Sequence, residues 1–246
     1  MKNITHVFFL VFGILNGQFL FSQATDFFKS GVIEFERKQN IMATFNYDPS
    51  IQNYVNKTGS EIYTSFFTLT LDPDQAIYQF GRNNGLFNQF PEMPADVNTI
   101  YHNFRDTKKI VQKNINGKVY SIVEENRKIL WKLTEEKKVI AGYECRRANG
   151  LIFDSIYVVA FFSEKFIPKI GPESFDGLPG LILGITIPSE HISWFAIKVT
   201  PMEIQQKIVP PSVAKEISFT DYQKMVETSF LKIPKFGMTL YKRALL

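Results

Sequence analysis

Hydrophobic and polar residues alternate in short runs along most of the chain. The first clear case is residues 66–71, where Phe67, Leu69 and Leu71 alternate with Thr68 and Thr70. Because successive side chains of a β-strand point to opposite faces, this alternation predicts a strand with one buried face. A turn at residues 72–74, Asp-Pro-Asp, leads into residues 76–80, so the two runs predict a β-hairpin.

The same pattern predicts further strands at regular intervals. They lie at residues 31–37, 99–104, 109–115, 118–124, 129–134, 139–147 and 193–199. Residues 156–162 are instead a continuous apolar run, which predicts a strand covered on both faces. Asn116-Gly117 predicts a two-residue hairpin turn, because both residues tolerate positive φ. A turn is also expected around Asn149-Gly150. Strands spaced by roughly ten residues and separated by turn sequences are typical of all-β proteins.

Residues 170–187, IGPESFDGLPGLILGITI, form a turn-rich approach to a buried strand. Pro179-Gly180 fits the central positions of a type II turn, since proline presets φ at the first and glycine tolerates positive φ at the second. The alternation that follows predicts one apolar face and one face with a notch at Gly184. The apolar face comprises Leu181, Leu183, Ile185 and Ile187, and the other face Ile182, Gly184 and Thr186. The loop before the strand serves either as a turn alone or as a contact for a ligand or partner.

Two segments predict helices. Asp48-Pro49 suits a helix N-terminus, so a short helix is expected within residues 47–55. Residues 220–223 have the pattern of a capping box, and hydrophobic residues then recur at helical spacing. These residues are Tyr222, Met225, Val226 and Phe230. They predict an amphipathic helix that covers the sheet.

A loop at residues 81–98 is rich in glycine, asparagine and proline, yet it carries large hydrophobic residues. These are Leu86, Phe87, Phe90 and Met93. Such a loop must either fold back on the core or cover something. We expect Phe87 and Phe90 to lie against the concave side of the sheet, where they would contact an apolar ligand.

Together these elements predict a mainly β fold with a single domain at residues 25–246. The expected architecture is one strongly curved antiparallel sheet, or half-barrel, of about ten strands, with the C-terminal helix as cover. The open half-barrels of periplasmic lipid and lipoprotein carriers provide a fold-level analogy.

Residues 1–24 have the pattern of a secretory signal peptide. Lys2 supplies a positive charge, residues 4–21 are a nearly continuous apolar run, and Ser22 and Ala24 are small residues that suit signal peptidase. A membrane anchor is the alternative, but glycine and polar residues interrupt a run near the lower limit for spanning. We expect cleavage near residues 22 to 25 and a periplasmic mature protein without a membrane span.

Composition narrows the possible partners. The formal net charge is +4, and charged residues of both signs make up 21% of the chain without a long basic run. Nucleic acid is therefore not expected as a partner. Cys145 is the only cysteine, which excludes an internal disulfide. Its strand context favours a buried structural residue over a reactive thiol.

The central stretch also carries a family resemblance. The hexapeptide at residues 177–182, GLPGLI, resembles the motif of the GLPGLI family of small exported proteins from Gram-negative bacteria. Upstream, residues 171–175 match its G-P-x-x-F, and residues 143–148 match its Y-x-C-x-x-A. Ala160-Phe161 departs from the family, which usually has tryptophan after the alanine. The resemblance covers residues 139–187, and it implies no activity, because none is established for the family.

Sequence signatures of catalysis are absent. Beyond the signal peptide the chain has only His102 and His191, without Cys or Asp ligands at metal spacing, so no metal and no cofactor are expected. No G-x-S-x-G elbow or phosphate-binding glycine motif occurs. A hydrolase stays open as an alternative, with Ser174, Asp176 and His191 as its candidate residues.

The expected function is therefore that of a non-enzymatic exported protein. It would bind an apolar ligand or another protein of the cell envelope, because the chain is rich in aromatic residues and has an apolar loop. The expected binding residues are Gly177, Leu178, Pro179, Gly180, Phe87 and Phe90.

Overall fold

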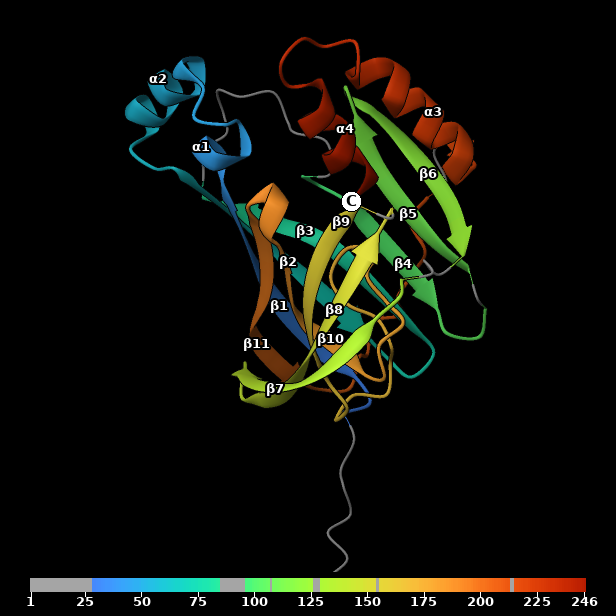
Figure 1. Ribbon diagram of the computed structural model, residues 1–246. Coiled ribbons are helices and arrows are strands. Elements are labelled where there is room, and N and C mark those ends of the chain that lie inside the picture. Colours follow the sequence, from blue (N-terminus) through green and yellow to red (C-terminus); the bar gives the residue numbers. More distant parts are fainter. Residues whose placement is uncertain (1–27, 85–95, 107, 126–128, 154, 213–214) are drawn as a thin grey trace, which may run out of the picture.

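The computed structural model describes residues 28–84, 96–106, 108–125, 129–153, 155–212 and 215–246. Twelve strands form one open, curved sheet with short helices around it (Figure 1). The predicted class, a mainly β fold with a curved sheet and a C-terminal helix, is confirmed. Residues 1–24, predicted to be a signal peptide, and the loop residues Phe87 and Phe90 lie outside the described residues.

The strands follow one another along the chain with few crossovers. They are β1 (Gly31–Asn40), β2 (Ile62–Leu71), β3 (Gln75–Asn83), β4 (Thr99–Asn103), β5 (Lys108–Ile115), β6 (Lys118–Glu125), β7 (Lys132–Ile140), β8 (Tyr143–Ile152), β9 (Ile156–Ser163), β10 (Leu181–Ile187), β11 (Ile192–Pro201) and β12 (Lys215–Ile217). Their order in the sheet is β12-β6-β5-β4-β3-β2-β1-β11-β10-β9-β8-β7. Strand β1 joins the two halves by antiparallel pairing with β2 and β11, and β12 pairs with β6 in parallel.

The helices are α1 (Ile41–Thr44), α2 (Pro49–Thr58), the 3₁₀ turn η1 (Pro188–Glu190), α3 (Phe219–Phe230) and α4 (Gly237–Leu245). Asp48 caps α2 and Pro49 is its first residue, as predicted. In α3 the predicted inward residues Tyr222, Val226 and Phe230 are buried. The helix starts earlier than expected, because Ser218 rather than Thr220 caps it. None of the described helices is long and apolar enough to cross a membrane.

Helix α4 was not predicted from the sequence. Its N-cap is Phe236, whose side chain makes no capping hydrogen bond, so the usual sequence signal for a helix start is missing. The helix packs against α3 beside β5 and β6 (Figure 1). Its last residues, Ala244 and Leu245, are buried in the same hydrophobic cluster as Tyr222.

The hairpin of β7 and β8 turns at a different place from the one predicted. Its turn residues are Ala141 and Gly142, with φ of 48° and 87°, as a two-residue hairpin turn with positive φ at both positions requires. Asn149 and Gly150, where a turn was expected, lie inside β8. Glycine suits this strand position because the Trp131 ring packs against it: a Cβ there would lie 2.7 Å from Trp131 Cε3.

The alternation predicted for β10 is interrupted by a β-bulge. The register of β10 against β9 shifts between Ile182 and Gly184, and the extra residue reverses the faces of the residues that follow. The expected apolar face is therefore divided: Leu181 and Leu183 belong to one core cluster, and Ile185 and Ile187 to another. The Phe195 ring of β11 fills the notch at Gly184, where a Cβ would lie 2.7 Å from its Cε1.

The connection between β9 and β10, residues 164–180, runs inside the curve of the sheet (Figure 1). It is held to β5 by side-chain hydrogen bonds and to β10 by the backbone hydrogen bond from Ile182 to Ile170. Strand β9 is consequently buried on both faces except at Tyr157, in agreement with the prediction from residues 156–162.

Candidate functional site

A buried ion pair fixes the β9–β10 connection to the sheet. Lys109 Nζ on β5 donates to Asp176 Oδ2 at 2.8 Å and to the Ser174 carbonyl oxygen at 3.1 Å. Both charged side chains are almost fully excluded from solvent, with exposed fractions of 0% and 1%. The Trp131 indole also donates to the Asp176 carbonyl oxygen, at 2.9 Å. Side chains from two separate parts of the chain thus converge on residues 174–176.

A second buried group links three distant parts of the chain. Arg37 of β1 and Arg243 of α4 both donate to Asp96 Oδ1, at 2.5 and 3.2 Å. Nearby, Asn98 donates to Glu173 Oε2 at 2.8 Å. Burial lowers the pKa of Arg37, but the carboxylates of Asp96 and Glu173 outweigh this effect and the pKa is raised. These groups join β1, α4 and the β9–β10 connection.

Other polar groups in this interior are kept neutral by burial. Burial raises the pKa of Tyr78 well above its usual value, and the charge of Glu173 adds to the shift. Burial also lowers the pKa of His102 to about 3, with a further contribution from the positive charge of Lys109. His102 is therefore a neutral imidazole at physiological pH.

The buried charges lie in the packed interior and are not accessible to a substrate. Arg37, Lys109, Glu173 and Asp176 are each no more than 1% exposed. Buried charges of this kind require partners, since an unpaired charge in a protein interior is strongly destabilising. We assign them to holding the β9–β10 connection in place.

The residues considered for a hydrolase do not form a catalytic triad. The Oγ atom of Ser174 is buried and has no hydrogen-bond partner among the described residues. Asp176 is paired with Lys109, and His191 is exposed at the turn after η1. The serine and the histidine are therefore not connected as nucleophilic catalysis requires.

The predicted binding residues of the central turn differ in exposure. Leu178 and Gly180 are buried, whereas Gly177 and Pro179 are exposed. The predicted type II turn is wrong: the Gly180 N–H donates to the Leu178 carbonyl oxygen at 2.8 Å, which is the hydrogen bond of a γ-turn centred on Pro179. Proline favours this turn because its φ is fixed near the required value.

Cys145 is buried on β8, as expected for a structural residue. Burial raises the pKa of its thiol to about 12. The reactive thiolate is therefore scarcely populated at physiological pH, and the residue acts as a small apolar side chain. Among the described residues there is also no cluster of acidic, histidine or cysteine side chains that would hold a metal ion.

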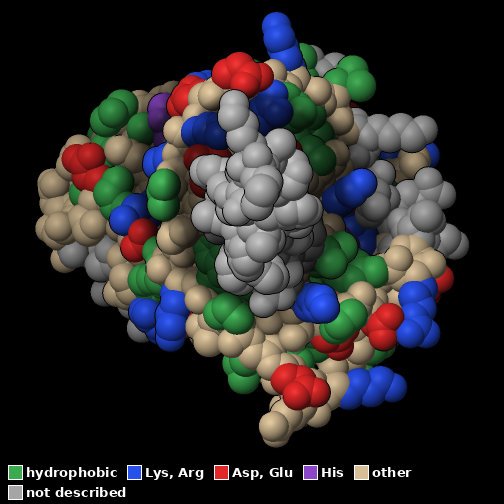
Figure 2. Space-filling model, turned by 90° about the horizontal axis from the view of Figure 1, so that it is seen from below, with side chains coloured by type: hydrophobic (Ala, Val, Ile, Leu, Met, Phe, Trp, Pro, Cys, Tyr) green, Lys and Arg blue, Asp and Glu red, His purple; other side chains and the backbone are tan. Residues whose placement is uncertain are grey.

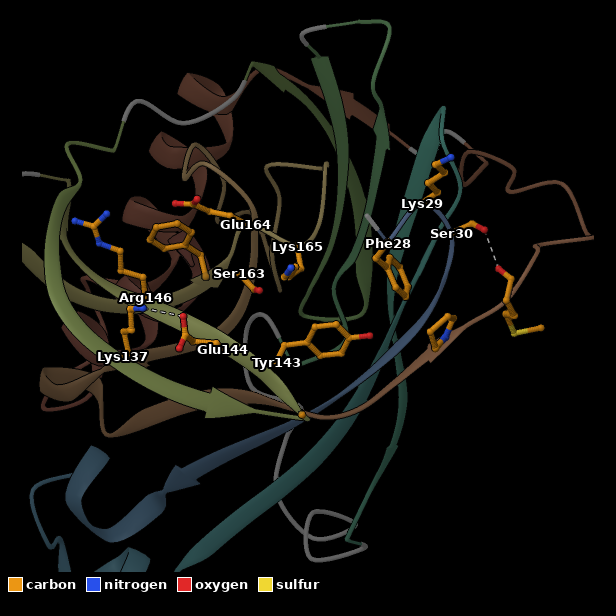
Figure 3. Close-up of a pocket in the computed structure, with 14 residues that line it drawn as sticks. Phe28, Lys29, Ser30, Lys137, Tyr143, Glu144, Arg146, Ser163, Glu164 and Lys165 are labelled. Carbon is orange, nitrogen blue, oxygen red and sulfur yellow. Dashed lines mark hydrogen bonds and ion pairs between the residues drawn. The ribbon is translucent and has the colours of Figure 1, made fainter. Parts of the chain in front are cut away.

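An open cavity of about 1100 Å³ lies at the end of the molecule where the described chain begins. Phe28 and Tyr143 supply aromatic surface to its lining (Figure 3). Its basic residues are Lys29, Lys137, Arg146 and Lys165, against the two acidic residues Glu144 and Glu164. Figure 2 views the molecule from this end and shows Lys and Arg side chains among hydrophobic ones. The cavity thus combines aromatic walls with an excess of positive charge.

Within the residues that the structure describes, some of the basic side chains around the cavity form ion pairs with acidic residues, and others do not. Lys137 pairs with Glu144 at 2.9 Å, and Arg146 pairs with Glu135 at 2.7 Å. Lys165, by contrast, has no acidic partner within salt-bridge distance among the described residues. A neutral polar residue, Ser163, is also part of the lining; its Oγ atom is buried and has no hydrogen-bond partner in the described part of the chain.

The aromatic wall of the cavity is held by ring packing. The ring centroids of Phe28 and Phe166 are 4.7 Å apart, and those of Tyr143 and Phe166 are also 4.7 Å apart. Phe166 is buried, so it supports the two rings that line the cavity from behind. The Phe28 N–H donates to the Lys165 carbonyl oxygen at 3.0 Å, which fixes the start of the described chain against the β9–β10 connection.

No sequence pattern indicated this cavity. Its lining comes from four segments, at residues 28–30, 137–146, 162–165 and 201–202, which the sheet order brings together. The expected apolar site lay elsewhere, on the concave face beneath α3. There the described residues form a packed cluster with Tyr222 and Val226.

Comparisons with known proteins characterise the fold of this open, curved sheet. No family model matches the chain, and no curated protein matches it. Two structures of PNGF-II, in different space groups, are similar with TM-scores of 0.50 and 0.52 at 13% sequence identity. The matches cover 82% of this chain and 34% and 33% of PNGF-II, so the chain spans about a third of the length of these structures.

A further structure is that of an uncharacterized conserved protein from Thermus thermophilus. It matches with a TM-score of 0.37 at 8% identity, over 77% of this chain and 91% of that chain. At these identities the similarity to PNGF-II concerns the fold alone. The resemblance to the GLPGLI family stays a prediction.

Proposed function

We propose that the protein is an exported, non-enzymatic binding protein of the GLPGLI type whose ligand has an apolar body and an anionic group. The observation that supports this proposal is the cavity lined by the aromatic rings of Phe28 and Tyr143 together with four basic residues. Its size, about 1100 Å³, is slightly above the usual range of ligand pockets and suits an extended molecule.

The two parts of such a ligand would be recognised by different physical effects. Burial of apolar ligand surface against the aromatic walls supplies the non-directional part of the binding free energy. The Lys165 ammonium supplies a charge for the anionic group, and Ser163 Oγ supplies a hydrogen bond. A few polar groups on an apolar wall are sufficient to orient a ligand.

Fluorescence titration with 11-(dansylamino)undecanoic acid tests the proposal. We expect saturable binding, and we expect Lys165→Glu to weaken it by roughly tenfold, because attraction of the carboxylate is replaced by repulsion. Lys57→Glu is the matched control, since Lys57 lies in the last turn of α2, away from the cavity. An unchanged affinity in Lys165→Glu, or no binding at all, would contradict the proposal.

A second candidate function is recognition of another envelope protein. It is supported by the exposure of Gly177 and Pro179 at the central turn, which the γ-turn holds rigidly. The absence of binding in the titration above would favour this candidate.

Export is part of the proposal and has its own test. We expect signal peptidase to cleave between about residues 22 and 25, because Ser22 and Ala24 are small. N-terminal sequencing of the protein recovered from the periplasm checks this expectation. A chain that still begins at Met1 would contradict it.

A further inference from the structure

A second cavity, of about 400 Å³, lies between the end of β4 and the start of the β9–β10 connection. Its apolar lining includes Phe104, Ile167 and Ile170, and prolines 73 and 168 flank them. Lys29 and Lys169 are its basic residues, and Asp106 is its acidic residue. Asp106 accepts a hydrogen bond from the Asn103 side chain at 3.2 Å, so its charge is partly engaged within its own turn.

The unusual member of this lining is His102. The residue is only 4% exposed, and its Nε2 atom is buried without a hydrogen-bond partner among the described residues. Buried polar atoms normally have a partner, so an unpaired ring nitrogen beside a cavity needs an explanation. Burial, together with the smaller effect of the Lys109 charge, lowers the pKa of the ring and keeps it neutral, which leaves one nitrogen as a donor and the other as an acceptor.

We propose that this cavity is a second ligand site, which takes a small aromatic compound that carries both a carboxylate and a hydroxyl group. The ring would pack against Phe104 and Ile167, and the carboxylate would interact with Lys169. The hydroxyl group would hydrogen-bond to His102. The site is distinct from the larger cavity, although Lys29 lines both.

The lining of this cavity restricts the class of ligand in three ways. A purely apolar ligand would leave the imidazole without a partner, whereas an extended chain needs more room than this cavity provides. The basic residues exceed the acidic one, which favours an anion. A hydroxylated aromatic acid satisfies all three conditions.

Nuclear magnetic resonance of the histidine side chains with 6-hydroxy-2-naphthoate tests the proposal. His102 and His191 are the two histidines of the described residues, and His191 is exposed at the turn after η1. We expect the probe to shift the ring ¹⁵N signals of His102 and to leave those of His191 unchanged. No shift of the His102 signals at millimolar probe would overturn the proposal.

Charge-reversal variants locate the bound probe. We expect Lys169→Glu to weaken binding of 6-hydroxy-2-naphthoate by roughly tenfold and Lys165→Glu to leave it unchanged. The reverse pattern would place the probe in the larger cavity and overturn the second site. 2-Naphthoate, which lacks the hydroxyl group, should bind more weakly than the hydroxylated probe, and equal affinity would contradict the role of His102.

The two sites can fail independently. The dansyl fatty acid reports on the larger cavity through Lys165, and the naphthoate reports on the smaller one through Lys169 and His102. Loss of the first signal with retention of the second would contradict only the proposed function. The spectra of the wild-type protein decide the role of His102 without substitution of that residue.

Discussion

Lys109→Met should lower the free energy of unfolding by about 3 to 5 kcal/mol, because it leaves a buried carboxylate without its partner. The ammonium of Lys109 is 2.8 Å from Asp176 Oδ2, and both side chains are inaccessible to solvent. Methionine keeps most of the side-chain volume, so the loss reports the charge and not a cavity. Urea unfolding followed by tryptophan fluorescence measures the change.

Two controls separate the buried pair from charge effects in general. The double variant Lys109→Met with Asp176→Asn should recover part of the loss, since removal of both charges also removes their desolvation cost. Arg105→Met breaks the exposed pair with Asp74, and we expect little change from it. Equal losses in Lys109→Met and Arg105→Met would contradict the assigned burial.

Gly180→Val should destabilise the protein by about 3 kcal/mol or more, because backbone strain and overpacking both apply. The φ of Gly180 is 153°, which side-chain-bearing residues rarely adopt, and a Cβ there would lie 2.3 Å from the Ser163 carbonyl oxygen. That oxygen belongs to the backbone at the end of β9, so it cannot move away without disturbing the sheet. Thermal unfolding measures the loss.

The comparison variants for this glycine are Ser174→Ala and Gly59→Val. Ser174→Ala removes a hydroxyl group without a hydrogen-bond partner among the described residues and should cost much less. Gly59 also has positive φ, at 71°, but nothing lies within 4 Å of a Cβ built there. Gly59→Val therefore measures strain alone. A melting temperature of Gly180→Val equal to that of Ser174→Ala would refute the tight contact with β9.

Local signals predicted those parts of the fold that depend on neighbouring residues. The alternation and turn residues identified the hairpins β2–β3 and β5–β6, and the Asp48-Pro49 sequence identified α2. The bulge in β10 was not predicted, because an inserted residue is specified by pairing with β9 and leaves no pattern in β10 itself. The turn at Ala141-Gly142 was missed since alanine seldom adopts positive φ.

The buried lysines occupy positions of β5 that the alternation pattern assigns to the buried face. Lys109 and Lys113 alternate with Val111 and Ile115 on one face of β5, and all four side chains are buried. Lysine is almost never fully buried without a partner, so a lysine in a strand is ordinarily read as exposed. The partners here, Asp176 and the Ala244 carbonyl oxygen, are more than sixty residues away in sequence, so only the tertiary structure identifies them.

The candidate cavities depend even more on long-range arrangement. Each is lined by segments from three or more parts of the chain, and the β9–β10 connection contributes to both. Pro168 and Lys169 have no sequence feature that marks them as lining residues. The apolar contacts expected of Phe87 and Phe90 stay a prediction, because both residues lie outside the described part of the chain.

Because the sheet is open, its two outermost strands determine whether the sheet can pair with strands of other chains. An unpaired strand edge is a template for aggregation with other chains. Strand β12 is only three residues long, which limits such pairing. Strand β7 is longer, but Lys132, Glu135, Glu136, Lys137 and Lys138 cover it with exposed charges of both signs. Any incoming strand would have to desolvate these charges, so the edge is protected against polymerisation without being closed.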